Sequence, residues 1–144
     1  MLLINVYWGE KSGRVFVPTM AKTATGFWVE VDPVEQAATS DVSSIAAALQ
    51  RCASRGNPAV QTPPRSAFPD WVVLKHANKK KRRDFENEYE LLSIEHTQGN
   101  EYLIRSHPRS KNLRGYEPER EARLTLRNES TFLEIASALK SVAH

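Results

Sequence analysis

Four histidines are the residues best able to support catalysis or metal binding in this chain. They are His76, His96, His107 and His144, and none belongs to an HxH or HExxH pattern or to a mixed cysteine and histidine cluster. Protein zinc sites depend on such spacings, so we expect no metal and no cofactor. His96 and His107 fall on the two strands of an expected hairpin, where their rings could approach each other. Histidines in such places are more often plain surface or half-buried residues.

The single cysteine, Cys52, is the only thiol that could act as a nucleophile. It falls on the apolar stripe of an expected helix, and a free cysteine in that position is usually an unreactive core residue. The sequence also has no GxSxG elbow and no glycine-rich loop that could hold phosphate. One cysteine excludes an internal disulfide, which is typical of a reducing compartment. We therefore expect that the protein is not an enzyme.

A metal-free ribonuclease is the enzyme class that these residues fit best. Such an enzyme needs a general acid, a general base and a cation beside the phosphate. His76, His96 and His107 could supply the acid and the base, and Lys75 or Arg105 the cation. Because nothing in the spacing fixes their geometry, this class is the weakest of the alternatives.

Two basic segments point to binding rather than catalysis. The first is the unbroken run Lys79, Lys80, Lys81, Arg82 and Arg83, and the second holds Arg109, Lys111 and Arg114. Together they could form a positive surface for phosphate, with aromatic rings stacking on bases. The nearby rings are Trp71, Phe85, Tyr102 and Tyr116. Each ring also suits a core position, and the acids that follow the first run would repel phosphate. A small RNA- or DNA-binding domain is therefore an alternative function.

An alternating segment near the N-terminus offers a different binding surface. In residues 27–35, the apolar side chains Phe27, Val29 and Val31 fall on one face of a strand. Trp28, Glu30 and Asp32 fall on the other face, where we expect them to meet solvent or a partner. Interfaces centre on a few aromatic or arginine anchors, and this favours Trp28 and Arg114 as contact residues.

The elements that position these residues follow from patterning. We expect strands at residues 2–8, 14–20, 27–35, 71–75, 89–96, 101–107 and 119–127. Pro18 indicates an edge strand or a bulge in the second of them. The segment 56–70 holds four prolines and is expected to be a loop.

Two amphipathic helices are expected at residues 41–54 and 131–143, with a short helix at 79–87 as a weaker expectation. Ser40 is the expected N-cap of the first helix, and Gly56 stands just past its end. Thr131 and Glu134 have the spacing of a capping box at the start of the last helix.

These elements predict an α+β fold, with a mostly antiparallel sheet of about six strands and two or three helices packed on it. Residues 1–144 are expected to form a single domain. A sequence of three strands and a helix occurs twice along the chain. An old duplication could produce this order. Identity between the halves is negligible, which favours the reading that a meander followed by a helix is simply a common unit.

The composition suits a globular protein, with 40% hydrophobic and 26% charged residues. The net charge of +3 lies entirely in residues 75–144, which permits an acidic partner without requiring one. The apolar start of the chain has no basic segment before it and is expected to be a strand, not a secretory signal. With no apolar stretch of about 20 residues to span a membrane, we expect a cytoplasmic protein.

Two parts of the sequence resemble small immunity proteins of bacterial contact-dependent growth inhibition systems. The first part is the segment GFWVEVDPVE at residues 26–35. The second runs from VVLKHA at residues 72–77 through Phe85 to LLSIE at 91–95 and YLI at 102–104. Such immunity proteins are encoded beside a toxin gene and protect the producing cell by binding the toxin domain.

The resemblance implies a cytoplasmic protein with no enzyme activity, no cofactor and a tightly bound toxin domain, which in many such systems is a nuclease. An inhibitor of a nuclease is expected to present acidic groups to the basic active site. Local acids at Glu30, Asp32 and Glu35, or between Asp84 and Glu90, could do so. The run 79–83 could instead dock on an acidic surface of the toxin away from its active site.

Overall fold

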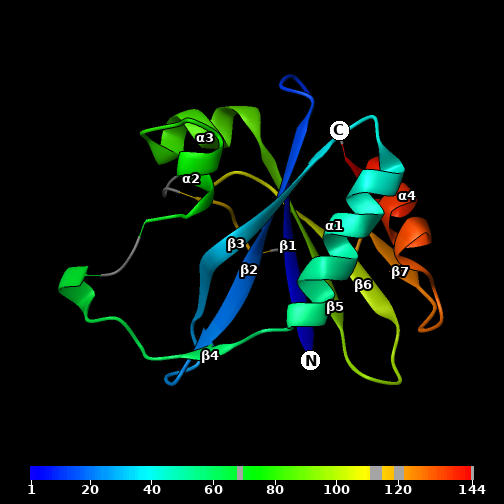
Figure 1. The fold of residues 1–144 in the computed structure, drawn as a ribbon, viewed down its shortest axis with the longest axis horizontal. Helices are drawn as coiled ribbons and strands as arrows, with labels where there is room; N and C mark the ends of the chain where they lie inside the picture. Colours follow the sequence, from blue (N-terminus) through cyan, green and yellow to red (C-terminus); the bar gives the residue numbers. More distant parts are fainter. Residues whose placement is uncertain (68–69, 111–114, 119–121, 144) are drawn as a thin grey trace.

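The computed structural model describes residues 1–67, 70–110, 115–118 and 122–143. Its centre is one seven-stranded sheet in the order β3-β2-β1-β5-β6-β7, with β4 pairing beside β2 (Figure 1). All neighbours are antiparallel except β2 and β4. The strands are Leu2–Gly9 (β1), Arg14–Thr23 (β2), Trp28–Ala38 (β3), Ala59–Val60 (β4), Glu90–His96 (β5), Tyr102–His107 (β6) and Leu124–Leu126 (β7). The predicted α+β class is confirmed.

The middle of the sheet is the antiparallel pair of β1 and β5, which runs in register from Leu2 opposite His96 to Trp8 opposite Glu90. Strands β2 and β3 of the first half lie on one side of this pair, and β6 and β7 of the second half lie on the other. Each half also contributes one long helix, α1 or α4. The repeated element order seen in the sequence is therefore matched by a symmetric strand order. Such symmetry is compatible with duplication and with two independent meanders.

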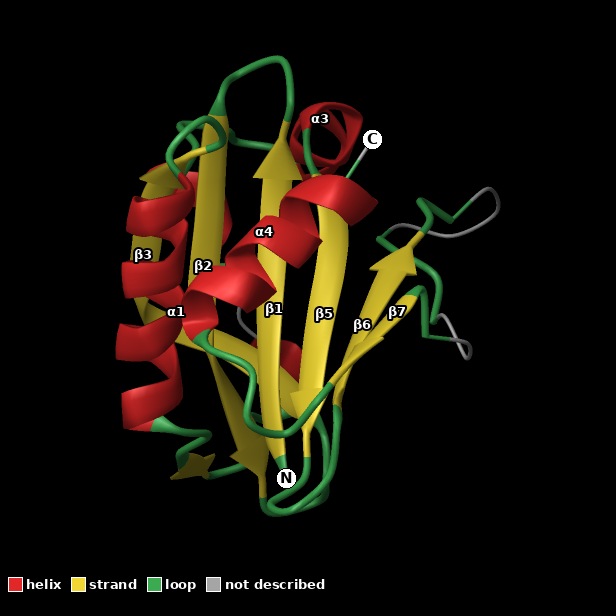
Figure 2. Ribbon diagram, turned by 90° about the vertical axis from the view of Figure 1, so that its right-hand side faces the viewer, coloured by secondary structure: helices red, strands yellow, loops and turns green. Residues whose placement is uncertain are grey.

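Helices Val42–Arg55 (α1) and Phe132–Val142 (α4) pack side by side on one face of the sheet (Figure 2). Their apolar stripes meet the alternate residues Ile4, Val6 and Trp8 of β1 in the larger core. Burial of this apolar area is the main force that holds the helices to the sheet. Cys52 is buried in the same core, as predicted, and burial raises the pKa of its thiol.

The ends of both long helices follow from local hydrogen bonds. The N-cap of α1 is Asp41, whose Oδ1 accepts from the Ser44 N–H at 3.0 Å, so the predicted cap at Ser40 was one residue early. Gly56 ends α1 at a positive φ of 69°, where glycine is free of Cβ strain. The predicted capping box is confirmed, with Thr131 accepting from the Glu134 N–H at 3.1 Å.

The opposite face of the sheet is covered only in part, by the short helices Val73–His76 (α2) and Arg82–Glu88 (α3). A smaller, mostly aromatic core lies beneath them. Its buried members are Tyr7, Phe16, Val73, Leu74, Ala77, Phe85 and Tyr89. The rings of Phe85 and Tyr89 stack with centroids 4.5 Å apart, and Tyr7 meets Phe85 edge-on at 5.0 Å. Phe85 is thus core and cannot stack on a base.

The expected strand at residues 71–75 was wrong, because this segment forms α2. Val73, Leu74 and Ala77 all reach the aromatic core, and only a helical turn places side chains at such spacing on one face. The Ala77 N–H donates to the Val73 carbonyl at 2.9 Å. Burial here overrides the strand preference of two successive valines.

One further strand bears out an expectation and another differs from it. The register of β2 against β3 shifts between Val17 and Thr19, so Pro18 marks a bulge in an inner strand and not an edge. The expected strand at 119–127 is present only as β7, from Leu124 to Leu126, and residues 119–121 lie outside the described part of the chain. Among the described residues, no helix is long and apolar enough to cross a membrane.

Leu133 and Leu139 of α4 allow a test of which face of this helix contributes to the free energy of unfolding. Leu139 is fully buried and Leu133 is 52% exposed. We predict that Leu139→Ala lowers the free energy of unfolding by about 2–5 kcal/mol, because a cavity opens against β1 and α1. The matched variant Leu133→Ala should change it by no more than about 0.5 kcal/mol. Urea denaturation measures both, and equal losses would contradict the packing described.

Candidate functional site

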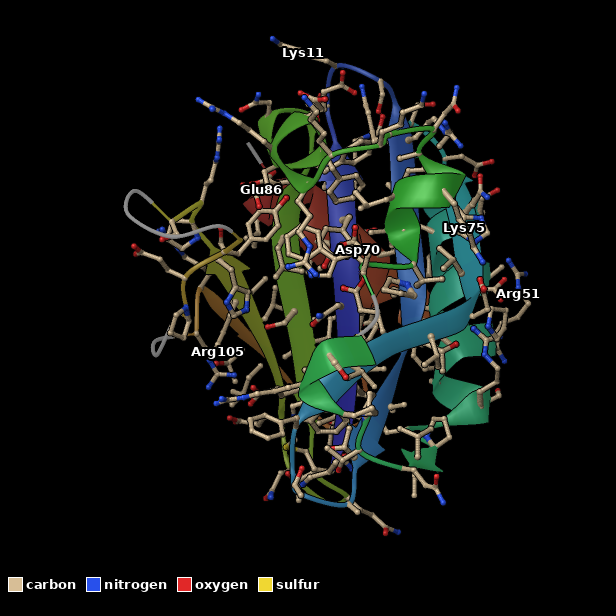
Figure 3. The ribbon with its side chains drawn as sticks, turned by 90° about the vertical axis from the view of Figure 1, so that its left-hand side faces the viewer. Lys11, Arg51, Asp70, Lys75, Glu86 and Arg105 are labelled. Carbon is tan, nitrogen blue, oxygen red and sulfur yellow. The ribbon has the colours of Figure 1, made fainter. Side chains whose placement is uncertain are left out.

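The partly covered face of the sheet holds a pocket of about 360 Å³ next to the aromatic core. Strands β1, β2, β3 and β5 form its floor, and α3 with the segments around Trp71 and Tyr116 forms its walls. It is lined by Asn5, Tyr7, Met20, Trp28, Val29, Glu30, Asp70, Trp71, Arg82, Leu91 and Tyr116. Figure 3 shows Asp70 in front of the middle of the sheet, between Glu86 and Lys75. Four aromatic rings and three charged groups thus share one hollow.

Glu30 is the central ionisable group of this pocket. Its Oε2 accepts a hydrogen bond from the Tyr7 hydroxyl, and its Oε1 is buried with no hydrogen-bond partner in the described structure. Burial raises the pKa of the Glu30 carboxyl to about 7, although the Tyr7 hydrogen bond and the charge of Arg82 lower it. Burial and the nearby Glu30 carboxylate also raise the pKa of Tyr7 well above its usual value. Of the two surroundings expected for Glu30, solvent or a partner, open solvent does not apply, because the side chain lies inside this pocket.

Arg82 forms the wall of the pocket opposite Glu30. Its Nε donates to Asp70 Oδ1 at 2.6 Å, and its guanidinium lies 4.6 Å from the centroid of the Trp71 ring. This hydrogen bond lowers the pKa of Asp70, so the two side chains form a neutral pair across the mouth of the pocket. The charge of Arg82 is therefore largely matched by Asp70, and the charge of Glu30 is not.

A second hollow adjoins the first and shares Glu30, Asp70 and Trp71 with it. Its rim carries Asp32, whose carboxylate binds Lys75 Nζ at 2.6 Å and His76 Nε2 at 3.0 Å. These two hydrogen bonds lower the pKa of the exposed Asp32 carboxyl. Asp32 thus lies at the surface as expected, but its charge is already engaged by α2.

The structure brings together two sets of residues that the sequence suggested separately. Trp28, Glu30 and Asp32 of β3 line the same two hollows as Lys79, Lys80 and Arg82 of the basic run. Lys79 pairs with Glu88 at 2.7 Å, and this contact raises its pKa. Lys80, Lys81 and Arg83 are exposed. The acidic strand and the basic run therefore form one mixed surface around the pocket.

Arg109 has a structural role that the sequence did not indicate. It hydrogen-bonds Asn87 and lies 3.4 Å from the Glu86 carboxylate, which is almost fully buried. Glu86 also accepts from the Gly115 N–H at 2.7 Å, so it ties the segment around Tyr116 to α3. Arg109 is therefore partly engaged by α3, and its place in a positive surface stays a prediction. Lys111 and Arg114 lie outside the described residues.

Sequence reasoning missed Tyr7, Asp70 and Glu86 as residues of this region. Tyr7 could have been found, because Asn5 and Tyr7 alternate with apolar residues along β1. One face of this strand therefore carries side chains that can form hydrogen bonds. No local signal marks Asp70 or Glu86. Asp70 stands at the end of a proline-rich loop. Glu86 follows the basic run, where an acidic side chain is usually exposed to solvent.

The three described histidines, His76, His96 and His107, lie apart and have separate partners. His96 pairs with Tyr102 across the hairpin and His107 with Leu91, so the two rings lie near opposite ends of it, roughly 17 Å apart at the rise of a strand. His96 stacks on Tyr102 and His107 contacts Ser93, while His76 binds Asp32. The proposed approach of His96 to His107 was wrong. No group of three or more potential metal ligands gathers within the described ranges.

Comparisons with known proteins give a structural likeness only. No family model and no curated protein matches this sequence. A protein of unknown function from Neisseria meningitidis has a similar structure, with a TM-score of 0.68 and 13% identity over 96% of this chain and 91% of that one. A chain of the CdiA-CT/CdiI toxin and immunity complex from Yersinia pseudotuberculosis matches with a TM-score of 0.65 and 10% identity, over 96% of this chain and 93% of that one.

The protein shares its fold with a chain of a toxin and immunity complex. Both likenesses extend over nearly the full length of each chain, so they include the sheet and the helices on both of its faces. At these identities they establish the fold alone.

The raised pKa of Glu30 predicts a specific pH dependence of stability. The carboxyl titrates near 4.5 in the unfolded chain and about 7 in the folded one. Between these values the unfolded state releases a proton that the folded state keeps, so stability falls as pH rises. Glu30→Gln removes this titration and keeps an acceptor for Tyr7. We predict that the variant gains up to about 3 kcal/mol relative to wild type between pH 4.5 and pH 8.

Denaturant unfolding of both proteins at the two pH values measures this difference. Other titrating groups cancel because they are common to both proteins. A difference that stays constant with pH would show that Glu30 is solvated and ordinary.

Proposed function

We propose that this protein is the immunity protein of a bacterial contact-dependent growth inhibition system. It binds the toxin domain encoded beside it and neutralises that domain in the cytoplasm of the producing cell. In this role it catalyses no reaction and needs no cofactor.

The observation that carries this proposal is the full-length likeness to a chain of the CdiA-CT/CdiI complex. The sequence resemblance in residues 26–35, 72–77, 85, 91–95 and 102–104 also supports it. Those residues lie in β3, α2, α3, β5 and the start of β6 or directly beside them. Together these elements surround the mixed surface described above. The distribution of the histidines adds support, since the three described rings are held apart by separate partners.

We further propose that the mixed surface is where the toxin domain binds. Trp28 and the two carboxylates beyond it on β3 are presented beside the basic run and the pocket. Trp28 is half-buried and carries Lys22 Nζ 5.3 Å from its ring centroid. Aromatic side chains at the edge of a pocket are the usual energetic centre of an interface. The remaining predicted contacts are Lys79, Lys80, Lys81, Arg82, Arg83, Arg109, Lys111 and Arg114.

A growth assay tests the function. The C-terminal domain encoded by the neighbouring gene is expressed from an inducible promoter, with and without this protein. We predict that the toxin domain alone stops growth, that co-expression restores it, and that the two proteins purify as a stoichiometric complex that persists at high salt. Arrested growth in both strains, with no complex, would contradict the proposal.

Nucleic-acid binding remains a second candidate because Lys80, Lys81 and Arg83 are exposed together. The triple variant in which each becomes Gln separates the two functions. If the protein is an immunity protein, the variant still restores growth. If the protein instead binds nucleic acid, wild type binds an oligonucleotide with a strong salt dependence, and the slope of log affinity against log salt falls by about 3 in the variant.

A further inference from the structure

The unpaired oxygen of Glu30 is the least satisfied polar atom of the pocket. Oε1 is buried and has no hydrogen-bond partner in the described structure, while Oε2 already accepts from Tyr7. Buried carboxylate oxygens without partners are costly, so each requires an explanation, and an ion or ligand that completes the site is one. The charged and titratable groups that face Glu30 are Tyr7 from β1, Arg82 from α3, Asp70 before α2, and Tyr116.

The charges of these groups leave a negative charge unmatched. Arg82 donates to Asp70 at 2.6 Å, so this pair is neutral by itself. Ionised Glu30 therefore has no cation in direct contact among the described residues. An anion entering the pocket would have to displace Asp70 from Arg82 and then sit beside Glu30. A cation has no need to displace Asp70 and is attracted by Glu30, although it shares the pocket with Arg82, whose own charge is paired with Asp70.

The aromatic walls suit a cation too. The pocket already shows this chemistry with groups of its own chain, because Arg82 lies over the Trp71 ring and Lys22 over the Trp28 ring. Trp71 and Tyr116 stack with centroids 5.9 Å apart and form one aromatic wall. The π face of such a ring carries partial negative charge, which attracts a cation. Met20, Val29 and Leu91 add apolar lining that fits the aliphatic stem of a basic side chain.

We infer that the pocket accepts an arginine or lysine side chain of the bound toxin domain, whose charged head pairs with Glu30 between the rings of Trp28 and Trp71. This inference rests on the proposed function for the identity of the partner, but not for the chemistry of the pocket. It also gives a basic immunity protein a local acidic contact for a basic toxin surface.

The pocket chemistry can be tested without the toxin. The probe is the tripeptide acetyl-Gly-Arg-Gly-amide, and its matched control carries citrulline, which is uncharged and nearly isosteric, in place of arginine. Binding is followed by nuclear magnetic resonance of the tryptophan indole N–H groups at pH 8. Trp8 is the internal reference, because its indole donates to Glu10 at 2.8 Å and belongs to the other core.

We expect saturable shifts at Trp28 and Trp71, none at Trp8, and at least about tenfold weaker binding of the citrulline peptide. Glu30→Gln, which keeps an acceptor for Tyr7, should weaken the arginine peptide by a similar factor. Glu129→Gln removes an equal charge from an exposed site outside the pocket and should change nothing. Equal binding of the two peptides, or no saturable shift with either, would overturn the inference.

The toxin domain supplies the second arm. If the inference holds, Glu30→Gln weakens the toxin complex at least tenfold at pH 8 and Glu129→Gln does not. If the toxin complex is tight and Glu30→Gln does not weaken it, the inference that the pocket binds a basic side chain of the toxin is refuted, and the proposed function is unaffected. If the arginine peptide binds specifically but no toxin complex forms, the proposed function is refuted, while the conclusion that the pocket binds an arginine side chain remains supported.

Discussion

The antiparallel pairing of β1 with β5 is the contact on which the rest of this structure depends. It joins the two halves of the chain at the centre of the sheet, with seven residues of each strand in register. Because strand side chains alternate, this register sends Ile4, Val6 and Trp8 to one face and Asn5 and Tyr7 to the other. A slip by one residue would exchange the two faces, burying Asn5 under α1 and α4 and removing Tyr7 from Glu30. Core and pocket are thus fixed by the same pairing.

The two faces of the sheet are covered unequally, and the site arises from this difference. Two long amphipathic helices close one face and supply most of the apolar burial. Two short helices cover part of the other face through a few aromatic contacts. Where that cover ends, a buried carboxylate and several rings are left at the edge of a pocket. A surface with fixed rings and an unmatched charge can recognise a partner without moving its own backbone.

Much of the fold could be predicted from the sequence because its main elements carry strong local signals. An apolar run predicted β1, alternation predicted β3 and a hairpin pattern predicted β5. Capping residues and helical stripes predicted α1 and α4 to within a residue or two. Residues 71–75 were mistaken for a strand because two valines favour extended backbone, and only the aromatic core, assembled from distant segments, makes a helical turn better. A pattern within a short segment does not reveal a core that is formed by segments far apart in the sequence.

The candidate site was predictable in its parts and not in its assembly. The sequence marked Trp28, Glu30 and Asp32, and separately the basic run, but nothing in it places Arg82 opposite Glu30. That placement depends on Asp70 and Trp71, which follow a proline-rich loop whose course no pattern specifies. The surroundings of Glu30 could not be predicted for the same reason, because Tyr7 of β1 and Arg82 of α3 come from distant parts of the chain to line the same pocket.

We propose that a toxin domain binds this protein by placing a positive charge against Glu30. Calorimetry of the complex near pH 7, in buffers of different ionisation enthalpy, counts the protons exchanged on binding. Because burial holds the Glu30 pKa at about 7, pairing with a cation should lower that pKa and release up to about half a proton. We predict this release for wild type and its absence in Glu30→Gln. The same proton count in both proteins, or no complex at all, would contradict it.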